Sequence, residues 1–185
     1  HLPVDETFNH QLWFAAAAAP LIHRSEEIHW QITRFMQRLP RNLRLYRSGL
    51  IVHPLLLPGW KKKAVEWKRS LKPSWRLALQ KKAVGYHLFN MYAFAMLHRV
   101  FPDDPFWQSE EFRRALNYCR SESFRDQLME NPYGFPYNPP GFEIALTMEE
   151  FGIGTADKRR WWVEEQLRRC YNFRTGLMDR ESEDP

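Results

Sequence analysis

The segment 82–101 constrains the fold more strongly than any other part of the chain. Its apolar residues recur at helical spacing, for example at Val84 and Leu88, but Phe94 and Leu97 make the opposite face apolar as well. A helix that is apolar on nearly every side is buried in a core or in a membrane. Charged and amide side chains interrupt this segment, so its apolar run is too short for a transmembrane span. We therefore predict the inner helix of a layered all-α fold.

Two further segments, 7–19 and 142–151, are apolar on most faces in the same way. An amphipathic segment follows each of the three, and these outer segments begin at Ser25, Ser109 and Thr155, residues that favour the N-cap of a helix. Such a repeat predicts parallel inner helices covered by outer helices, as in an (α/α) toroid. The first turns of the inner helices would then open at one concave end.

The connecting segments carry weaker signals. Residues 43–46 and 50–53, separated by a turn, predict one short β-hairpin. The region 60–82 is basic and contains several Trp residues, and we expect a helix over 61–70 followed by a loop broken at Pro73.

The composition narrows the choice of partners. The chain has 185 residues, enough for one domain, and carries a net charge of +5, which favours anionic partners. Aromatic residues make up 15% of the chain, with eight Trp, so flat apolar rings are available for ligand contact. Only Cys119 and Cys170 are present, and we expect both to be buried free thiols. No metal-ligand spacing or nucleotide-binding motif is found, so we predict no cofactor and no metal site.

Three short stretches resemble a known group of enzymes. They are Thr-Phe-Asn-His-Gln-Leu-Trp-Phe at 7–14, Gly-Tyr-His-Leu-Phe-Asn at 85–90 and Asn-Pro-Pro-Gly-Phe-Glu at 138–143. The pattern resembles the (α/α)-toroid carbohydrate-active enzymes: six-hairpin glycosidases, toroid polysaccharide lyases and the N-acylglucosamine 2-epimerase group. The epimerase group usually carries a His at 141–142, where this chain has Gly-Phe, which disfavours epimerisation. A full toroid has more hairpins than are visible here, so we expect residues 1–185 to form a single helical domain from a longer, incomplete toroid.

The candidate catalytic residues are placed near the starts of the predicted inner helices. His10 and His87 could act as proton-transfer groups, because the pKa of an unperturbed imidazole lies in the working range, although a hydrogen-bonded structural histidine is the alternative. Glu143 follows Pro-Pro-Gly in an apolar helix, where a carboxyl group should be paired, protonated or functional. The alternative for Glu143 is an acid favoured by the helix dipole. Tyr137 is a candidate base or sugar ligand in the preceding loop, which could equally be a rigid turn.

The candidate substrate-binding residues are amides and aromatic rings. The amides could bind sugar hydroxyl groups, and the rings could stack on sugar faces, although most Trp residues in proteins belong to the core. The set is Asn9, Trp13, Trp60, Tyr86, Asn90 and Asn138.

The leading hypothesis is a glycoside hydrolase or polysaccharide lyase acting on an acidic or uronate-containing oligo- or polysaccharide. Hydrolysis uses two carboxylates, and neither Asp5 nor Glu6 is convincingly placed as the second, so the reaction stays open. The alternative is a non-catalytic helical module that binds protein or nucleic acid through its basic 60–82 region, but the polar starts of the inner helices disfavour it. A third hypothesis, membrane association through that region, has less support, because the region has no clean amphipathic stripe. Oligomeric state stays open, as does the compartment: cytoplasm, or periplasm or secretion after removal of a signal peptide.

Overall fold

The structure, a computed structural model, describes residues 7–53, 73–135 and 137–180. These residues form seven α-helices, which confirms the all-α class. The helices are α1 (Phe8–Ala18), α2 (Glu26–Asn42), α4 (Pro73–Val100), α5 (Glu110–Tyr118), α6 (Glu122–Met129), α7 (Pro140–Glu150) and α8 (Ala156–Cys170), with the short 3-10 helices η1 (Ala19–Leu21) and η2 (Pro105–Gln108). Within the described ranges, no helix has the length and apolar character needed to cross a membrane.

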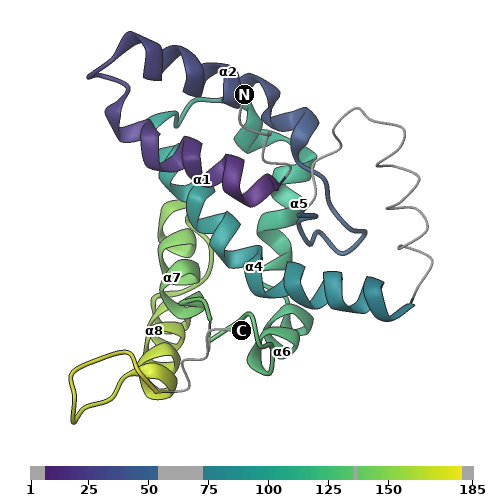
Figure 1. The fold of residues 1–185 in the computed structure, drawn as a ribbon, viewed down its shortest axis with the longest axis vertical. Coiled ribbons are helices and arrows are strands. Elements are labelled where there is room, and N and C mark those ends of the chain that lie inside the picture. The colour runs from purple at the N-terminus through teal and green to yellow at the C-terminus, as the bar shows by residue number, and fades with distance from the viewer. Residues whose placement is uncertain (1–6, 54–72, 136, 181–185) are drawn as a thin grey trace.

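Helix α4 is the centre of the molecule, with α1 packed along it on one side and α7 on another (Figure 1). The contacts at the two ends of α7 show that α7 runs parallel to α4. Asn138, just before α7, donates a hydrogen bond to the carbonyl of Gly85 at 3.3 Å, and Glu150 at its end pairs with His98 and Arg99, each at 2.7 Å. The three apolar segments thus lie side by side. Three inner helices do not close a ring, and a complete toroid stays a prediction.

The outer helices begin where their capping residues predict. The hydroxyl oxygens of Ser25, Ser109 and Thr155 accept hydrogen bonds from backbone N–H groups three residues later. Helix α4 differs from the expectation, because residues 73–81 are helical and form no loop. Proline has a backbone angle suited to the first turn of a helix, so Pro73 is compatible with a helical segment.

The predicted β-hairpin is wrong. The described segment 43–53 forms one isolated antiparallel bridge, between Leu45 and Ile51, and no named strand. Two strands alone are marginally stable. Tyr46 N donates to the carbonyl of Leu50 at 2.8 Å and Val52 N to the carbonyl of Arg44 at 2.9 Å, but other backbone groups of this segment bond to helices. The N–H of Ile51 points to the ring of His87 on α4, and the carbonyl of His53 accepts a bond from Phe8 N at 2.8 Å.

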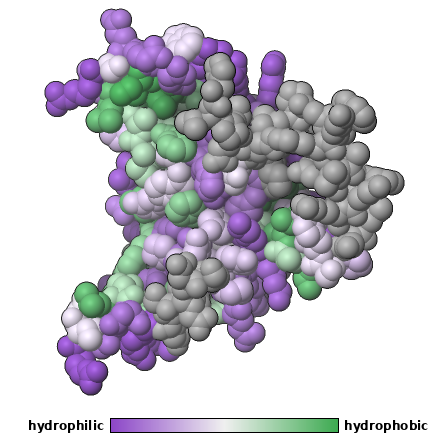
Figure 2. Space-filling model, viewed as in Figure 1, coloured by the Kyte–Doolittle hydropathy of each residue, from purple (hydrophilic) through white to green (hydrophobic). Residues whose placement is uncertain are grey.

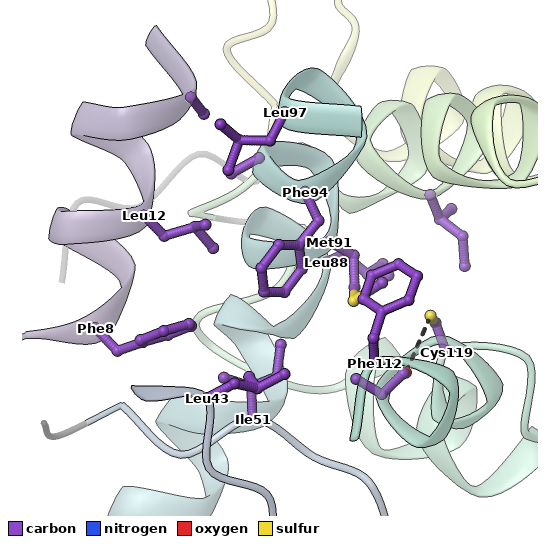
Figure 3. Packing of buried hydrophobic residues seen from close by; sticks show 14 of the residues in the cluster. Phe8, Leu12, Leu43, Ile51, Leu88, Met91, Phe94, Leu97, Phe112 and Cys119 are labelled. Carbon is purple, nitrogen blue, oxygen red and sulfur yellow. Dashed lines mark hydrogen bonds between the residues drawn. The ribbon is translucent and has the colours of Figure 1, made fainter. Parts of the chain in front are cut away.

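The core fills the space between α1, α4 and α5 (Figure 3). Phe8 and Leu12 of α1 point toward Phe94 of α4, which contacts Phe112 of α5 edge to face at a centroid distance of 5.7 Å. Burying one such side chain stabilises the fold by about 1.5–3 kcal/mol. Cys119 and Cys170 are both buried thiols, as predicted.

Gly141 explains how closely α8 covers α7. A Cβ atom at this position would overlap the backbone of Trp162 and lie 2.6 Å from the Cβ of Gln166. The Gly141 N–H donates a 3.0 Å hydrogen bond to the side-chain oxygen of Gln166. This close approach fixes the first turn of α7, which carries Glu143.

Candidate functional site

A continuous set of aromatic rings links α1, α4 and the loop that precedes α7. We call it the aromatic face, and its members are Trp13, Tyr86, Phe89, Tyr92, Tyr133 and Tyr137. On α4, three of these rings recur every third residue, a spacing that places them along one side of the helix. Tyr137 is 41% exposed and the other five are half-buried, so the face is partly open to solvent. The outline of the molecule is hollowed on the side between α1 and the segment after α8 (Figure 2).

The rings of the aromatic face contact one another directly. Trp13 stacks on Phe89, with centroids 4.4 Å apart, and lies 5.6 Å from Tyr92. Tyr86 lies 5.8 Å from Phe89 and 5.8 Å from Tyr137. These distances fall in the range at which aromatic pairs attract each other. The rings therefore form a preorganised apolar surface rather than separate side chains.

Each of the three inner helices carries a buried polar side chain that is not fully hydrogen-bonded. Asn9, Asn90 and Glu143 are 3%, 0% and 4% exposed. Among the described residues, no hydrogen-bond partner is found for the side-chain oxygen of Asn9, either amide atom of Asn90 or one carboxyl oxygen of Glu143. The indole N–H of Trp13 has none either. A buried polar group without a partner destabilises a protein by about 1–3 kcal/mol, so four of them together require an explanation.

The contacts between α4 and α7 place Glu143 along the axis of α4. Asn138 contacts Gly85 and Glu150 contacts His98, so residues of α7 lie level with α4 residues numbered about 52 lower. Glu143 is therefore level with residues 90 and 91 of α4. Two of the unpartnered polar groups, on Asn90 and Glu143, share this level.

Burial controls the protonation of the site. It raises the pKa of Glu143 to about 8, so its carboxyl group carries a proton at neutral pH and can donate it. Burial, together with the nearby hydroxyl of Tyr137, raises the pKa of Tyr86 above its ordinary value. A tyrosine with a raised pKa stays neutral and serves as a hydrogen-bond donor rather than as a base.

His87, a candidate proton-transfer residue, lies apart from the aromatic face. It is fully buried, its Nδ1 accepts from Ile51 N at 3.4 Å, and its Nε2 is 3.1 Å from the carbonyl of Ala115. Burial lowers the pKa of His87 to about 4. A neutral ring with both nitrogens bonded to backbone groups has the geometry of a core histidine, and we leave it out of the site.

The other predicted site residues are placed as follows. The amide nitrogen of Asn138 donates to the carbonyls of Gly85 and Tyr133, so this side chain shapes the loop before α7. His10 is exposed at the start of α1. Trp60 and most of the basic 60–82 region lie outside the described residues.

Sequence reasoning missed several members of the site. Phe89, Tyr92 and Tyr133 belong to the aromatic face, and the three-residue spacing on α4 was the signal that could have found the first two. His53 was missed as well; its ring lies 5.1 Å from Tyr86 and its Nδ1 has no partner. Across the described residues, no group of three His, Cys, Asp or Glu side chains could hold a metal ion.

The chain is similar to one curated protein, the "Archaeal glycosylation protein Q" of Haloferax volcanii. The two are 37% identical over 199 aligned positions, which cover 99% of this chain and 54% of that protein. The chain thus spans about half the length of this relative. No family model matches the sequence, and no solved structure matches it.

Proposed function

We propose that this chain supplies the sugar-binding and acid–base site of a glycan-processing enzyme that acts on an acidic or uronate-containing glycan. The name of the Haloferax relative supports a role in glycosylation. The observation that carries the proposal is Glu143: a buried carboxyl group, held in its protonated form, with one oxygen that has no hydrogen-bond partner among the described residues, on the helix that packs against α4.

The aromatic face and the buried amides suit a sugar. The rings of Trp13 and Phe89 offer flat apolar surface to the C–H groups of a sugar ring. The unpartnered amide atoms of Asn9 and Asn90 and the indole N–H of Trp13 can exchange hydrogen bonds with hydroxyl groups. A ligand that made these bonds would relieve the destabilisation that the free protein carries.

Glu143 is the general acid in this proposal. Its proton passes to the oxygen of the leaving group as the glycosidic bond breaks, and its raised pKa keeps the acid loaded at neutral pH. Because Glu143 is 4% exposed, side chains around it must move aside for a substrate to reach it. His10 and Tyr137, both exposed, are the candidates for the group that activates water or takes the sugar proton.

The test is a glycan panel with the variant Glu143→Gln in the protein that carries this chain. Loss of a general acid lowers turnover by about 100-fold or more. The matched control is Glu149→Gln, an exposed acid on the same helix, which should leave turnover unchanged. New reducing ends without new ultraviolet absorbance indicate hydrolysis, whereas a new C=C bond conjugated to the carboxylate indicates elimination. Equal turnover of Glu143→Gln and the parent protein on every glycan would refute the assignment.

A further inference from the structure

A pocket separate from the aromatic face lies where the end of α5 and the start of α6 meet the start of α8. Its volume is about 570 Å³, and no residue of the aromatic face lines it. Its charged lining residues are Arg120, Glu122, Arg125 and Lys158. The function proposed above makes no use of this pocket.

The pocket holds positive charge that is only partly neutralised. Arg120 and Lys158 are exposed and form no ion pair with any described residue. Arg125 reaches Asp126 at 3.2 Å, and both of these side chains are exposed. Elsewhere in the described chain, by contrast, a pair of arginines shares the carboxylate of Glu165. Two free cations and one acid in a concave site attract an anion.

A tryptophan makes one wall of the same pocket. Trp161 is 42% exposed, which is high for so large an apolar ring, and Trp162 packs against it edge to face at 5.0 Å. The buried Trp162 holds the exposed ring in place. An open indole face next to free cations suits a ligand that joins an anionic group to a ring with an apolar face.

We propose that this pocket is a second binding site, for a sugar that carries a carboxylate or phosphate group. Arg120 and Lys158 hold the anion, and the indole of Trp161 stacks on the sugar ring. The choice of a sugar as the ring rests on the proposed function, whereas the choice of an anion rests on the pocket alone.

Isothermal titration calorimetry with four compounds tests the proposal: glucuronate, glucose 1-phosphate, neutral glucose and inorganic phosphate. We expect at least one anionic sugar to bind, glucose not to bind, and inorganic phosphate to bind more weakly than glucose 1-phosphate. Comparing the affinity of glucuronate with that of glucose 1-phosphate shows whether the pocket prefers a carboxylate or a phosphate group. Absence of binding by both anionic sugars up to about 10 mM, beyond the weak end of specific affinities, overturns the proposal.

Variants at exposed positions localise the binding without threatening the fold. Arg120→Ala and Lys158→Ala should each weaken the anionic sugar about fivefold or more, since each removes a charge-assisted hydrogen bond. Arg38→Ala, an exposed arginine on α2, is the matched control and should bind as the parent does. Trp161→Leu should remove the preference for glucose 1-phosphate over inorganic phosphate. Parent-like binding in both Arg120→Ala and Lys158→Ala overturns the site.

One more variant separates this proposal from the proposed function. Glu143→Gln should leave binding at the second pocket unchanged, so a failure of Glu143 as an acid does not remove the second site. Binding that Trp13→Ala abolishes and Arg120→Ala does not would place the anionic sugar on the aromatic face, and would overturn the second site alone.

Discussion

Replacing Glu143 with glutamine should change how stability depends on pH. The folded-state pKa of about 8 lies above the ordinary value of 4.5 because burial penalises the charged form. The folded protein therefore binds the proton more tightly than the unfolded chain does. The resulting stability is fully present below pH 4.5 and is lost as the pH rises toward 8.

The size of the effect follows from the two pKa values. The gap corresponds to about 5 kcal/mol at about 1.36 kcal/mol per pKa unit, and about 3 kcal/mol of it falls between pH 5 and pH 8. Glutamine has nearly the same shape as a protonated glutamate and does not ionise. The stability of Glu143→Gln relative to the parent should therefore increase by about 3 kcal/mol over this interval.

Urea unfolding followed by circular dichroism, at several pH values from 5 to 8, measures this difference. Taking the difference between the two proteins cancels the contributions of other groups, including the buried His53 and His87. Glu149→Gln, an exposed acid on α7, is the control and should track the parent at every pH. A difference between Glu143→Gln and the parent that stays constant across the interval would show that the carboxyl group is solvated or paired, and would refute the reasoning.

Three further outcomes follow from the structure. Asn90→Leu should stabilise the protein by about 1 kcal/mol in urea unfolding, because it removes two unpartnered polar atoms, and should abolish glycan binding; a destabilised variant that still binds would contradict this. Gly141→Ala should destabilise by about 3 kcal/mol, because the new Cβ overlaps α8, and an unchanged thermal midpoint would contradict the close approach. Because the pKa of His87 is lowered to about 4, its contribution to stability is present above pH 6.5 and is lost as the pH falls toward 4. His87→Leu should therefore reduce the slope of the free energy of unfolding against pH between 4 and 6.5, measured by urea unfolding. An unchanged slope would show that the ring is already solvated.

Much of the helical layout could be read from the sequence because burial imposes a pattern. An apolar surface on every side marks an inner helix, as in the segment that became α4, and Ser25, Ser109 and Thr155 mark helix starts through their own side-chain bonds. The spacing of residues along the sequence does not show which other segment of the chain packs against a given side of a helix or loop. The segment around the bridge between Leu45 and Ile51 is an example, since the N–H of Ile51 bonds to the ring of His87 and the carbonyl of His53 bonds to Phe8 N, and local spacing predicts neither partner.

The site shows the same limit. His87 and Asn90 are three residues apart and lie about 60° from each other around the helix, so the sequence allowed them to share a cleft. In the structure, α5 supplies the carbonyl that binds His87, whereas the amide of Asn90 has no partner. Glu143 was recognisable because a carboxyl group in an apolar helix is rare enough to require a reason. The aromatic face was harder to recognise, because an aromatic stripe on an apolar helix is most often core.

In the proposed function, the aromatic face on α1, α4 and the loop before α7 binds a glycan. The most direct measurement is the indole N–H resonance of Trp13, assigned with Trp13→Phe, in an NMR titration with an oligosaccharide that contains uronate. This N–H has no hydrogen-bond partner in the described part of the chain, so a hydroxyl group placed on the aromatic face should shift its resonance strongly and saturably. A Trp13 resonance that stays in place while the same oligosaccharide binds would locate the glycan elsewhere and contradict the account.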